Sequence, residues 1–140
     1  MIDDIKKLIL SHSEVVNVIS QRANLEDYIS KLYGFATILP YYKGSKLKGF
    51  IAYYSNDPQK ENAFLSILII DKESAGEGLA KLLLECSVSD LINQGFKNYR
   101  LEVLKENSRA IGLYEKFGFT IENESENTYS MILRIAEYAG

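Results

Sequence analysis

The chain is poor in the residues and segments that staple a protein or anchor it in a membrane. Its single cysteine, Cys86, excludes an internal disulfide and any metal site built from several cysteines. No apolar run approaches the roughly 18 residues of a membrane span. The first ten residues carry acids where a signal peptide has only basic residues, so we expect a soluble, cytoplasmic protein with no membrane partner.

An excess of positive charge is also missing. Sixteen lysines and arginines oppose nineteen aspartates and glutamates, which leaves a formal net charge of −3. A protein that binds duplex nucleic acid normally presents a basic face, so we expect no nucleic-acid partner. The length of 140 residues and the 46% hydrophobic content predict that residues 1–140 form a single globular domain.

Hydrophobic spacing gives an outline of the secondary structure. The first 35 residues show helical spacing, and Asn24 is placed to cap a helix, whereas residues 14–20 fit either a helix or an extended segment. The nearly all-apolar run at 63–71 predicts a central strand covered on both faces. Together with further strands and helices, this order predicts an α/β (α+β) domain with one sheet and helices on both faces. The further strands are expected at 36–43, 49–55, 98–105, 119–123 and 128–135, and the helices at 79–93 and 107–118.

A glycine-bearing turn at 74–78 joins the predicted central strand to the next helix. A helix N-terminus offers unpaired N–H groups and the positive end of the helix dipole, and glycine lets a ligand approach the backbone. Phosphate or pyrophosphate is the natural ligand of such a place. The dinucleotide fingerprint is excluded because Lys81 stands where its third glycine belongs, and the turn by itself fits a tight connection equally well.

A second motif lies downstream, where residues 107–119 read NSRAIGLYEKFGF. With the glycine turn, it resembles the GNAT family of N-acetyltransferases, whose motif N-x-x-A-x-x-L-Y-x-x-x-G-F is complete here. The family's loop motif, [RQ]-x-x-G-x-[GA], falls on residues 75–80, and the resemblance covers about residues 36 to 135. It implies a GNAT-like mixed, mostly antiparallel sheet, acetyl-CoA as co-substrate, an amine acceptor, no metal, and a monomer or homodimer.

The resemblance also implies which residues form the site. Tyr114 matches the tyrosine that protonates the leaving thiolate, and a phenol with an ordinary pKa near 10 keeps its proton at neutral pH. The backbone of residues 68–70 matches the strand that pairs with pantetheine and faces the acetyl oxygen. The full set of residues implied to bind the co-substrate is Leu68, Ile69, Ile70, Gly76, Glu77, Gly78, Leu79, Ala80, Lys81, Asn107, Ala110 and Leu113.

Glu102 is the candidate general base. It lies between apolar neighbours in a predicted strand, where a carboxylate is costly unless it is paired or used. It also stands twelve residues before Tyr114, as in family members that acetylate protein N-terminal amines. A salt bridge with Arg100 or Arg134 explains the carboxylate equally well, and water relayed to solvent is a third route for the proton.

The resemblance predicts an N-acetyltransferase that acts by direct attack of a primary amine, with a small-molecule amine or amino sugar as first acceptor and a protein N-terminal amine as second. The family's Arg or Gln at the loop start is Ala75 here, and the loop is acidic. These departures keep a second hypothesis open, a catalytically degenerate module that binds CoA or another protein. His12 shows no obvious partner, and Cys86 is expected to pack in the core.

Overall fold

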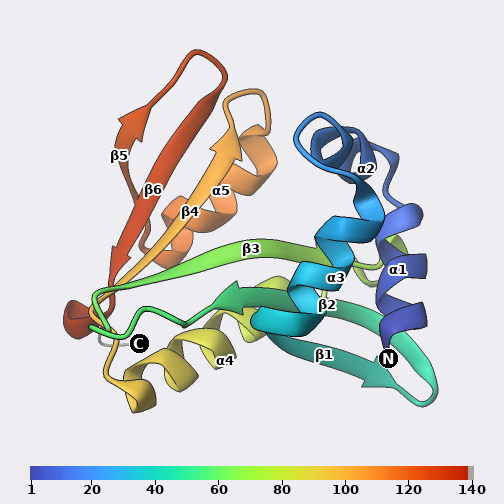
Figure 1. The fold of residues 1–140 in the computed structure, drawn as a ribbon, viewed down its shortest axis with the longest axis horizontal. Coiled ribbons are helices and arrows are strands. Elements are labelled where there is room, and N and C mark those ends of the chain that lie inside the picture. Colours follow the sequence, from blue (N-terminus) through green and yellow to red (C-terminus); the bar gives the residue numbers. More distant parts are fainter. Residues whose placement is uncertain (139–140) are drawn as a thin grey trace.

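The computed structural model describes residues 1–138 (Figure 1). Residues 14–20, which fitted two conformations, belong to a helix. The helices are α1 (Ile2–Leu10), α2 (Ser13–Ser20), α3 (Leu25–Phe35), α4 (Leu79–Gln94) and α5 (Ser108–Phe117), with short 3-10 turns η1 (Lys72–Ser74) and η2 (Ile135–Glu137). The strands are β1 (Thr37–Lys43), β2 (Lys46–Tyr54), β3 (Asn62–Ile70), β4 (Asn98–Leu104), β5 (Thr120–Glu124) and β6 (Thr128–Arg134).

The six strands form one sheet in the order β1-β2-β3-β4-β6-β5. Only the central pair, β3 and β4, is parallel, and the other pairs are antiparallel, which confirms the predicted fold class. The central pair is in register only from Asn62 opposite Asn98 to Phe64 opposite Arg100. Beyond that point the two strands diverge, as Figure 1 shows. This opening between β3 and β4 positions the site.

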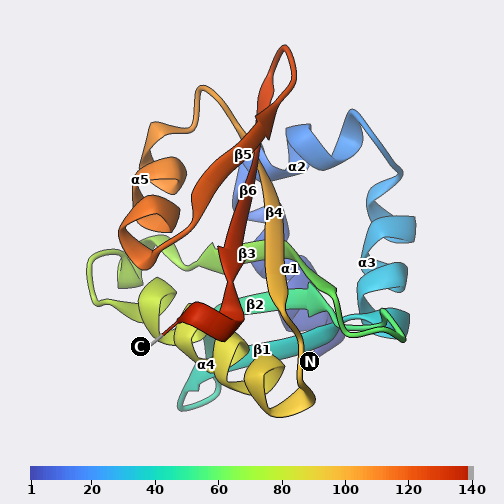
Figure 2. The ribbon, with the colours of Figure 1, turned by 90° about the vertical axis from the view of Figure 1, so that its left-hand side faces the viewer.

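Helices cover both faces of the sheet, as the sequence predicted (Figure 2). On one face α4 and α5 pack over a core that includes Tyr53, Tyr99 and Phe119. On the other face α1, α2 and α3 pack over a second core that includes Phe50 and Ile67. The N-terminal 35 residues therefore complete the domain by closing one face of its sheet.

A bulge in β3 decides which side chains face the opening. Ile67 pairs with Ala52 and Leu65 pairs with Tyr53, so Ser66 is the extra residue between them. β3 contributes buried side chains to both cores, Ala63 and Leu65 to one and Ile67 and Ile69 to the other, so the predicted cover on both faces is found except near Phe64, which is 41% exposed. The exposed side chains, Asn62 and Phe64, lie at the start of the strand, in the part that is still in register with β4.

Local signals placed several element ends correctly. The Asn24 side chain accepts hydrogen bonds from the N–H groups of Glu26 and Asp27 and so caps α3. Gly95 ends α4 in the left-handed region, at φ 88°. The expectation that Cys86 packs in the core is wrong, because its side chain is exposed. The stripe of α4 that faces the sheet runs through Leu79, Leu83, Leu84, Ser87, Val88 and Leu91, and position 86 lies off it.

Candidate active site

A cleft of about 550 Å³, which we call the donor cleft, lies between the end of β3, the start of α4 and the start of α5. It brings together nearly all of the residues that the resemblance implied. The predicted residues that line it are Leu68, Ile69, Ile70, Gly76, Gly78, Leu79, Ala80, Lys81, Asn107, Ala110, Leu113 and Tyr114. Glu77 lies outside the lining, and its N–H is donated to the carbonyl oxygen of Ser74 at 3.3 Å.

The glycine turn shapes one wall of the donor cleft. Gly76 and Gly78 have φ of 85° and 76°, a left-handed conformation that side chains with a Cβ rarely adopt. A Cβ at either position would touch nothing within 4 Å, so the requirement for glycine is set by the backbone and not by space. Gly78 is the N-cap of α4 and supplies no side-chain cap. The first N–H groups of the helix therefore have no intrahelical partner, which suits an anionic ligand.

Cations outnumber acids along the donor cleft. Lys72, Lys81 and Arg109 line it, whereas Glu14 is the acid among the lining residues that the structure describes. Arg109 lies inside the second motif, at a position for which the sequence predicted no role. Three cations around a helix N-terminus are suited to a polyphosphate.

The acids of the loop that follows β3 are balanced by the β1–β2 hairpin. The Lys46 Nζ lies 3.1 Å from a carboxylate oxygen of Glu73, and the Lys48 Nζ lies 3.6 Å from one of Asp71. Each lysine also lies within 4 Å of the other acid. The acidic loop was expected to repel a phosphate ligand. Its negative charge is largely offset by two lysines that lie more than twenty positions earlier in the chain.

The free edge of β3 forms another part of the donor cleft. The Asp71 N–H donates to the Lys48 carbonyl at 2.8 Å, which fixes the pairing of this end of β3 with β2. Because backbone groups of an antiparallel pair alternate in direction, those of Ile70 and Leu68 point away from β2 and those of Ile69 point toward it. Leu68 therefore offers its N–H and carbonyl groups to the opening, where β4 has already diverged, and Ile70 offers its N–H, because the Ile70 carbonyl oxygen lies 3.0 Å from a ring nitrogen of His12.

His12 has partners that the sequence did not reveal. It is buried, and it lines the donor cleft. One ring nitrogen lies 3.0 Å from the Leu8 carbonyl oxygen, and the other lies 3.0 Å from the Ile70 carbonyl oxygen. His12 thus ties the corner between α1 and α2 to the open edge of β3. The second contact joins residues 58 positions apart, which no local pattern reports.

Tyr114 lies on α5 at the wall of the donor cleft. Its side chain is 8% exposed, and its ring packs edge-on against Phe119 with the ring centres 5.7 Å apart. Burial raises the pKa of Tyr114 to about 12. The hydroxyl therefore remains a hydrogen-bond and proton donor throughout the neutral range.

Glu102 lies outside the donor cleft, in a second hollow of about 300 Å³ that we call the inner hollow. Its Oε2 accepts a hydrogen bond from Nη1 of Arg22 at 3.1 Å, and the two side chains are 43% and 62% exposed. The salt bridge considered with Arg100 or Arg134 therefore forms with Arg22 instead, while Arg100 pairs with Glu122. The inner hollow is lined by Val18, Ile19, Arg22, Ala23, Tyr28, Phe64, Leu65, Ser66, Glu102, Val103, Leu104 and Thr128.

A pair of hydroxyl groups also lines the inner hollow. The hydroxyls of Tyr28 on α3 and Ser66 on β3 share a hydrogen bond of 2.8 Å. Burial raises the pKa of Tyr28 to about 12, against a smaller lowering by the Ser66 hydrogen bond. The bulge at Ser66 was the signal that would have drawn attention to this residue, but a bulge is visible only once the strands are paired.

An outer hollow adjoins the inner one and shares Val18, Arg22, Leu104 and Thr128 with it. The outer hollow carries three exposed carboxylates, Glu14, Glu106 and Glu126. The Arg22–Glu102 pair thus stands where the two hollows meet. Within residues 1–138, no three His, Cys, Asp or Glu side chains are grouped closely enough to hold a metal ion. In that same range, no helix is long and apolar enough to cross a membrane.

Comparison with known proteins assigns the family. The acetyltransferase (GNAT) family matches residues 5–119, and the chain belongs to this family. The chain is 29% identical over 121 residues to the spermine/spermidine N(1)-acetyltransferase of Bacillus subtilis (strain 168), a match that covers 82% of this chain and 78% of that protein. It is 27% identical over 82 residues to the mycothiol acetyltransferase of Jonesia denitrificans, a match that covers 59% of this chain but only 26% of that protein.

A solved structure shares the fold. The PaiA N-acetyltransferase from Thermoplasma acidophilum, in complex with coenzyme A, superposes with a TM-score of 0.77 at 19% identity, covering 95% of this chain and 92% of that chain. The likeness confirms the predicted fold class. Family membership confirms the predicted enzyme class, an N-acetyltransferase with acetyl-CoA as its co-substrate.

Proposed function

We propose that this protein transfers an acetyl group from acetyl-CoA to the primary amine of a small molecule by direct attack, with Tyr114 as general acid. The observation that carries the proposal is the opening between β3 and β4. On one side it exposes a free strand edge, an uncapped helix N-terminus and Tyr114 within a single cleft. On the other side it exposes the Glu102 carboxylate in a hollow of its own.

The donor cleft fits acetyl-CoA through three sets of groups. The first amides of α4 and the cations Lys72, Lys81 and Arg109 would hold the phosphates, which takes over the role of the side chain that Ala75 lacks. The outward backbone groups of Leu68 and Ile70 would pair with the amides of pantetheine. An N–H of this edge would also donate to the oxygen on which charge develops.

Each step of the transfer has a residue that serves it. Holding amine and thioester together supplies proximity, which is worth several kcal/mol of the barrier. As the amine nitrogen bonds to the acetyl carbon, its proton passes to the carboxylate of Glu102. When the carbon–sulfur bond breaks, the Tyr114 hydroxyl gives its proton to the sulfur, so the thiol leaves neutral. The raised pKa of Tyr114 means that this proton is present at working pH.

The acceptor is assigned here only as a small primary amine. The named relatives include enzymes for spermine or spermidine and for mycothiol, which differ chemically. The inner hollow, at about 300 Å³, is suited to a small molecule. A protein N-terminal amine is the second candidate, because Glu102 stands twelve residues before Tyr114 as in relatives that act on such amines.

Two measurements test the proposal. Calorimetry with acetyl-CoA reports binding, and thiol release reports turnover over a panel of amino acids, polyamines, amino sugars and short peptides. We expect binding of acetyl-CoA together with thiol release for at least one small amine. Binding without turnover on any amine would favour the degenerate module, and the absence of both would reject the donor cleft as a CoA site.

A further inference from the structure

We infer that the acceptor is a free α-amino acid with an apolar side chain, and that Arg22 selects it by binding its carboxylate. The inference rests on the proposed function and names the acceptor of the same site. It starts from the ion pair between Arg22 and Glu102, which stands in a hollow whose walls are otherwise mostly apolar.

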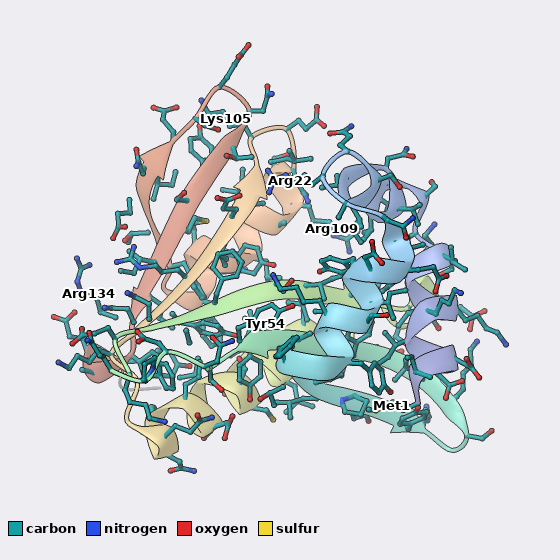
Figure 3. All side chains as sticks on the ribbon, viewed as in Figure 1. Met1, Arg22, Tyr54, Lys105, Arg109 and Arg134 are labelled. Atoms are coloured by element: carbon teal, nitrogen blue, oxygen red, sulfur yellow. The ribbon has the colours of Figure 1, made fainter. Side chains whose placement is uncertain are left out.

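The guanidinium of Arg22 has donors to spare. Arg22 follows α2, and its side chain extends toward β4, where one nitrogen, Nη1, donates to Glu102 (Figure 3). Within residues 1–138, this is the side-chain hydrogen bond that the structure gives to Arg22. A guanidinium carries five N–H groups in a planar fork that matches a carboxylate in two-point contact. Arg22 is therefore equipped to bind a second carboxylate beside that of Glu102.

An α-amino acid carries the same two charges as the ion pair, in reverse order. When the amino acid binds beside the pair, its ammonium contacts Glu102 and its carboxylate contacts Arg22. Every charge in the inner hollow then has a partner of opposite sign. Both side chains of the pair are about half exposed, and such a pair adds little to stability. Rearranging it around a substrate therefore costs little, and two charge-assisted hydrogen bonds are gained.

The rest of the inner hollow favours an apolar side chain. Its lining includes the apolar residues Phe64, Leu65 and Val103. Apart from the ion pair, its polar groups are mainly the hydroxyls of Tyr28 and Ser66. A polyamine would bring several cations next to Arg22 and against apolar walls, which repulsion and desolvation both disfavour. The carboxylates of the outer hollow work in the opposite direction, so a polyamine is the competitor that the experiment must include.

The same place suits the chemistry. Ser66 and Glu102 each lie two residues beyond the last registered pair, Phe64 opposite Arg100. They thus flank the point where the strands begin to diverge, and the donor cleft opens further along the same divergence. An ammonium held by Glu102 at this point lies on the acceptor side of that opening. It loses its first proton to solvent water, and the neutral amine then attacks the thioester and passes its second proton to Glu102.

The test compares matched acceptors with and without a carboxylate. Thiol release is measured for apolar α-amino acids, for their α-carboxamides and for spermidine, with the wild type, Arg22→Gln and Arg22→Lys. Arg100→Gln is the control, since Arg100 lies on the same strand as Glu102 and pairs with Glu122 outside the hollow. We expect the wild type to prefer the amino acid over its amide by about tenfold or more in kcat/KM.

Arg22→Gln is expected to remove that preference, raising KM for the amino acid by about 10- to 100-fold and changing the constants for the amide much less. Arg22→Lys retains part of it, and Arg100→Gln behaves as the wild type. Equal use of amide and amino acid by the wild type, an unchanged ratio in Arg22→Gln, or a preference for spermidine would overturn the inference while leaving an amine acetyltransferase in place. Failure to turn over any amine would remove the proposed function and this inference with it.

Discussion

The two sides of the β3–β4 opening are built in different ways. The donor cleft offers mainly backbone groups: the outward edge of Leu68 and Ile70, and the first amides of α4 after Gly78. The inner hollow offers side chains, chiefly the Arg22–Glu102 pair and two hydroxyls. Under the proposed function, this difference means that the donor is recognised mainly through a backbone conformation, whereas the acceptor is recognised through the identity of a few side chains.

The two sides of the opening also differ in net charge. The donor cleft has an excess of cations, as a polyphosphate requires, and the nearby acids are paired with the hairpin lysines Lys46 and Lys48. The inner hollow carries one cation and one anion in contact. Substitutions on one side should therefore change the kinetic constants of one substrate and leave those of the other nearly unchanged.

The largest expected effect comes from Tyr114→Phe. Removal of the proposed general acid should lower kcat by about 100-fold, with acetyl-CoA binding little changed in calorimetry. Tyr99→Phe is the matched control, because Tyr99 packs in the same core and donates its hydroxyl hydrogen to Ser87 at 3.0 Å, away from the cleft. A similar loss of kcat in both variants would mean that core packing, and not proton donation, limits the rate.

The next effect tests recognition through the backbone. Gly78→Ala forces a Cβ into the left-handed region at a cost of about 1–2 kcal/mol, and the strain should tilt the first amides of α4. We expect acetyl-CoA affinity to fall by about tenfold and the melting temperature by a few degrees. Gly95→Ala provides the control, since Gly95 has φ 88° and open space at the other end of the same helix. Gly95→Ala should lower Tm by a similar amount and leave acetyl-CoA binding intact. A loss of binding in this variant as well would mean that destabilisation of α4 as a whole, and not the position of its first amides, weakens binding.

The sequence predicted the donor cleft much better than the inner hollow. The donor cleft is built mainly from two contiguous stretches, 68–81 and 107–114, so local motifs predicted most of its lining, and His12, Glu14 and Val15 complete it from the N-terminal helices. The inner hollow joins Arg22 to Glu102 across 80 positions and Tyr28 to Ser66 across 38. No local pattern links such residues, since their contact depends on how the N-terminal helices pack on the sheet.

The fold shows the same limit. The strands, the helix caps at Asn24 and Gly95, and helices on both faces followed from periodicity and capping residues. Apolar composition could not tell a strand residue that packs against protein from one that lines a hollow, and this is why the exposure of Phe64 in β3 was not expected. His12 was misjudged for a related reason, because its partner is a backbone carbonyl, which has no signature in the sequence.

A smaller effect is expected from the lysines that balance the acidic loop. Lys48→Gln removes one of two cations near Asp71 and Glu73, so the loop becomes more repulsive to a phosphate ligand. We expect KM for acetyl-CoA to rise by about threefold, more at low than at high salt, with the acceptor KM unchanged. Lys97→Gln removes an exposed ion pair with Glu61 outside the cleft lining. It should neither raise KM for acetyl-CoA nor make it depend on salt. A salt-independent rise would indicate that the lysine acts through packing.

The smallest expected effect separates two roles of Asn107. Its Oδ1 accepts a hydrogen bond from the Ala110 N–H at 3.1 Å and caps α5, while the residue also lines the donor cleft. Asn107→Ala should cost about 1 kcal/mol of stability through loss of the cap. Asn107→Ser restores a capping oxygen but has a shorter side chain, so we expect thermal unfolding to return to the wild-type value while KM for acetyl-CoA stays about threefold raised. If serine restores both quantities, capping alone accounts for Asn107, and the donor cleft depends on the backbone at this position as it does at the glycine turn.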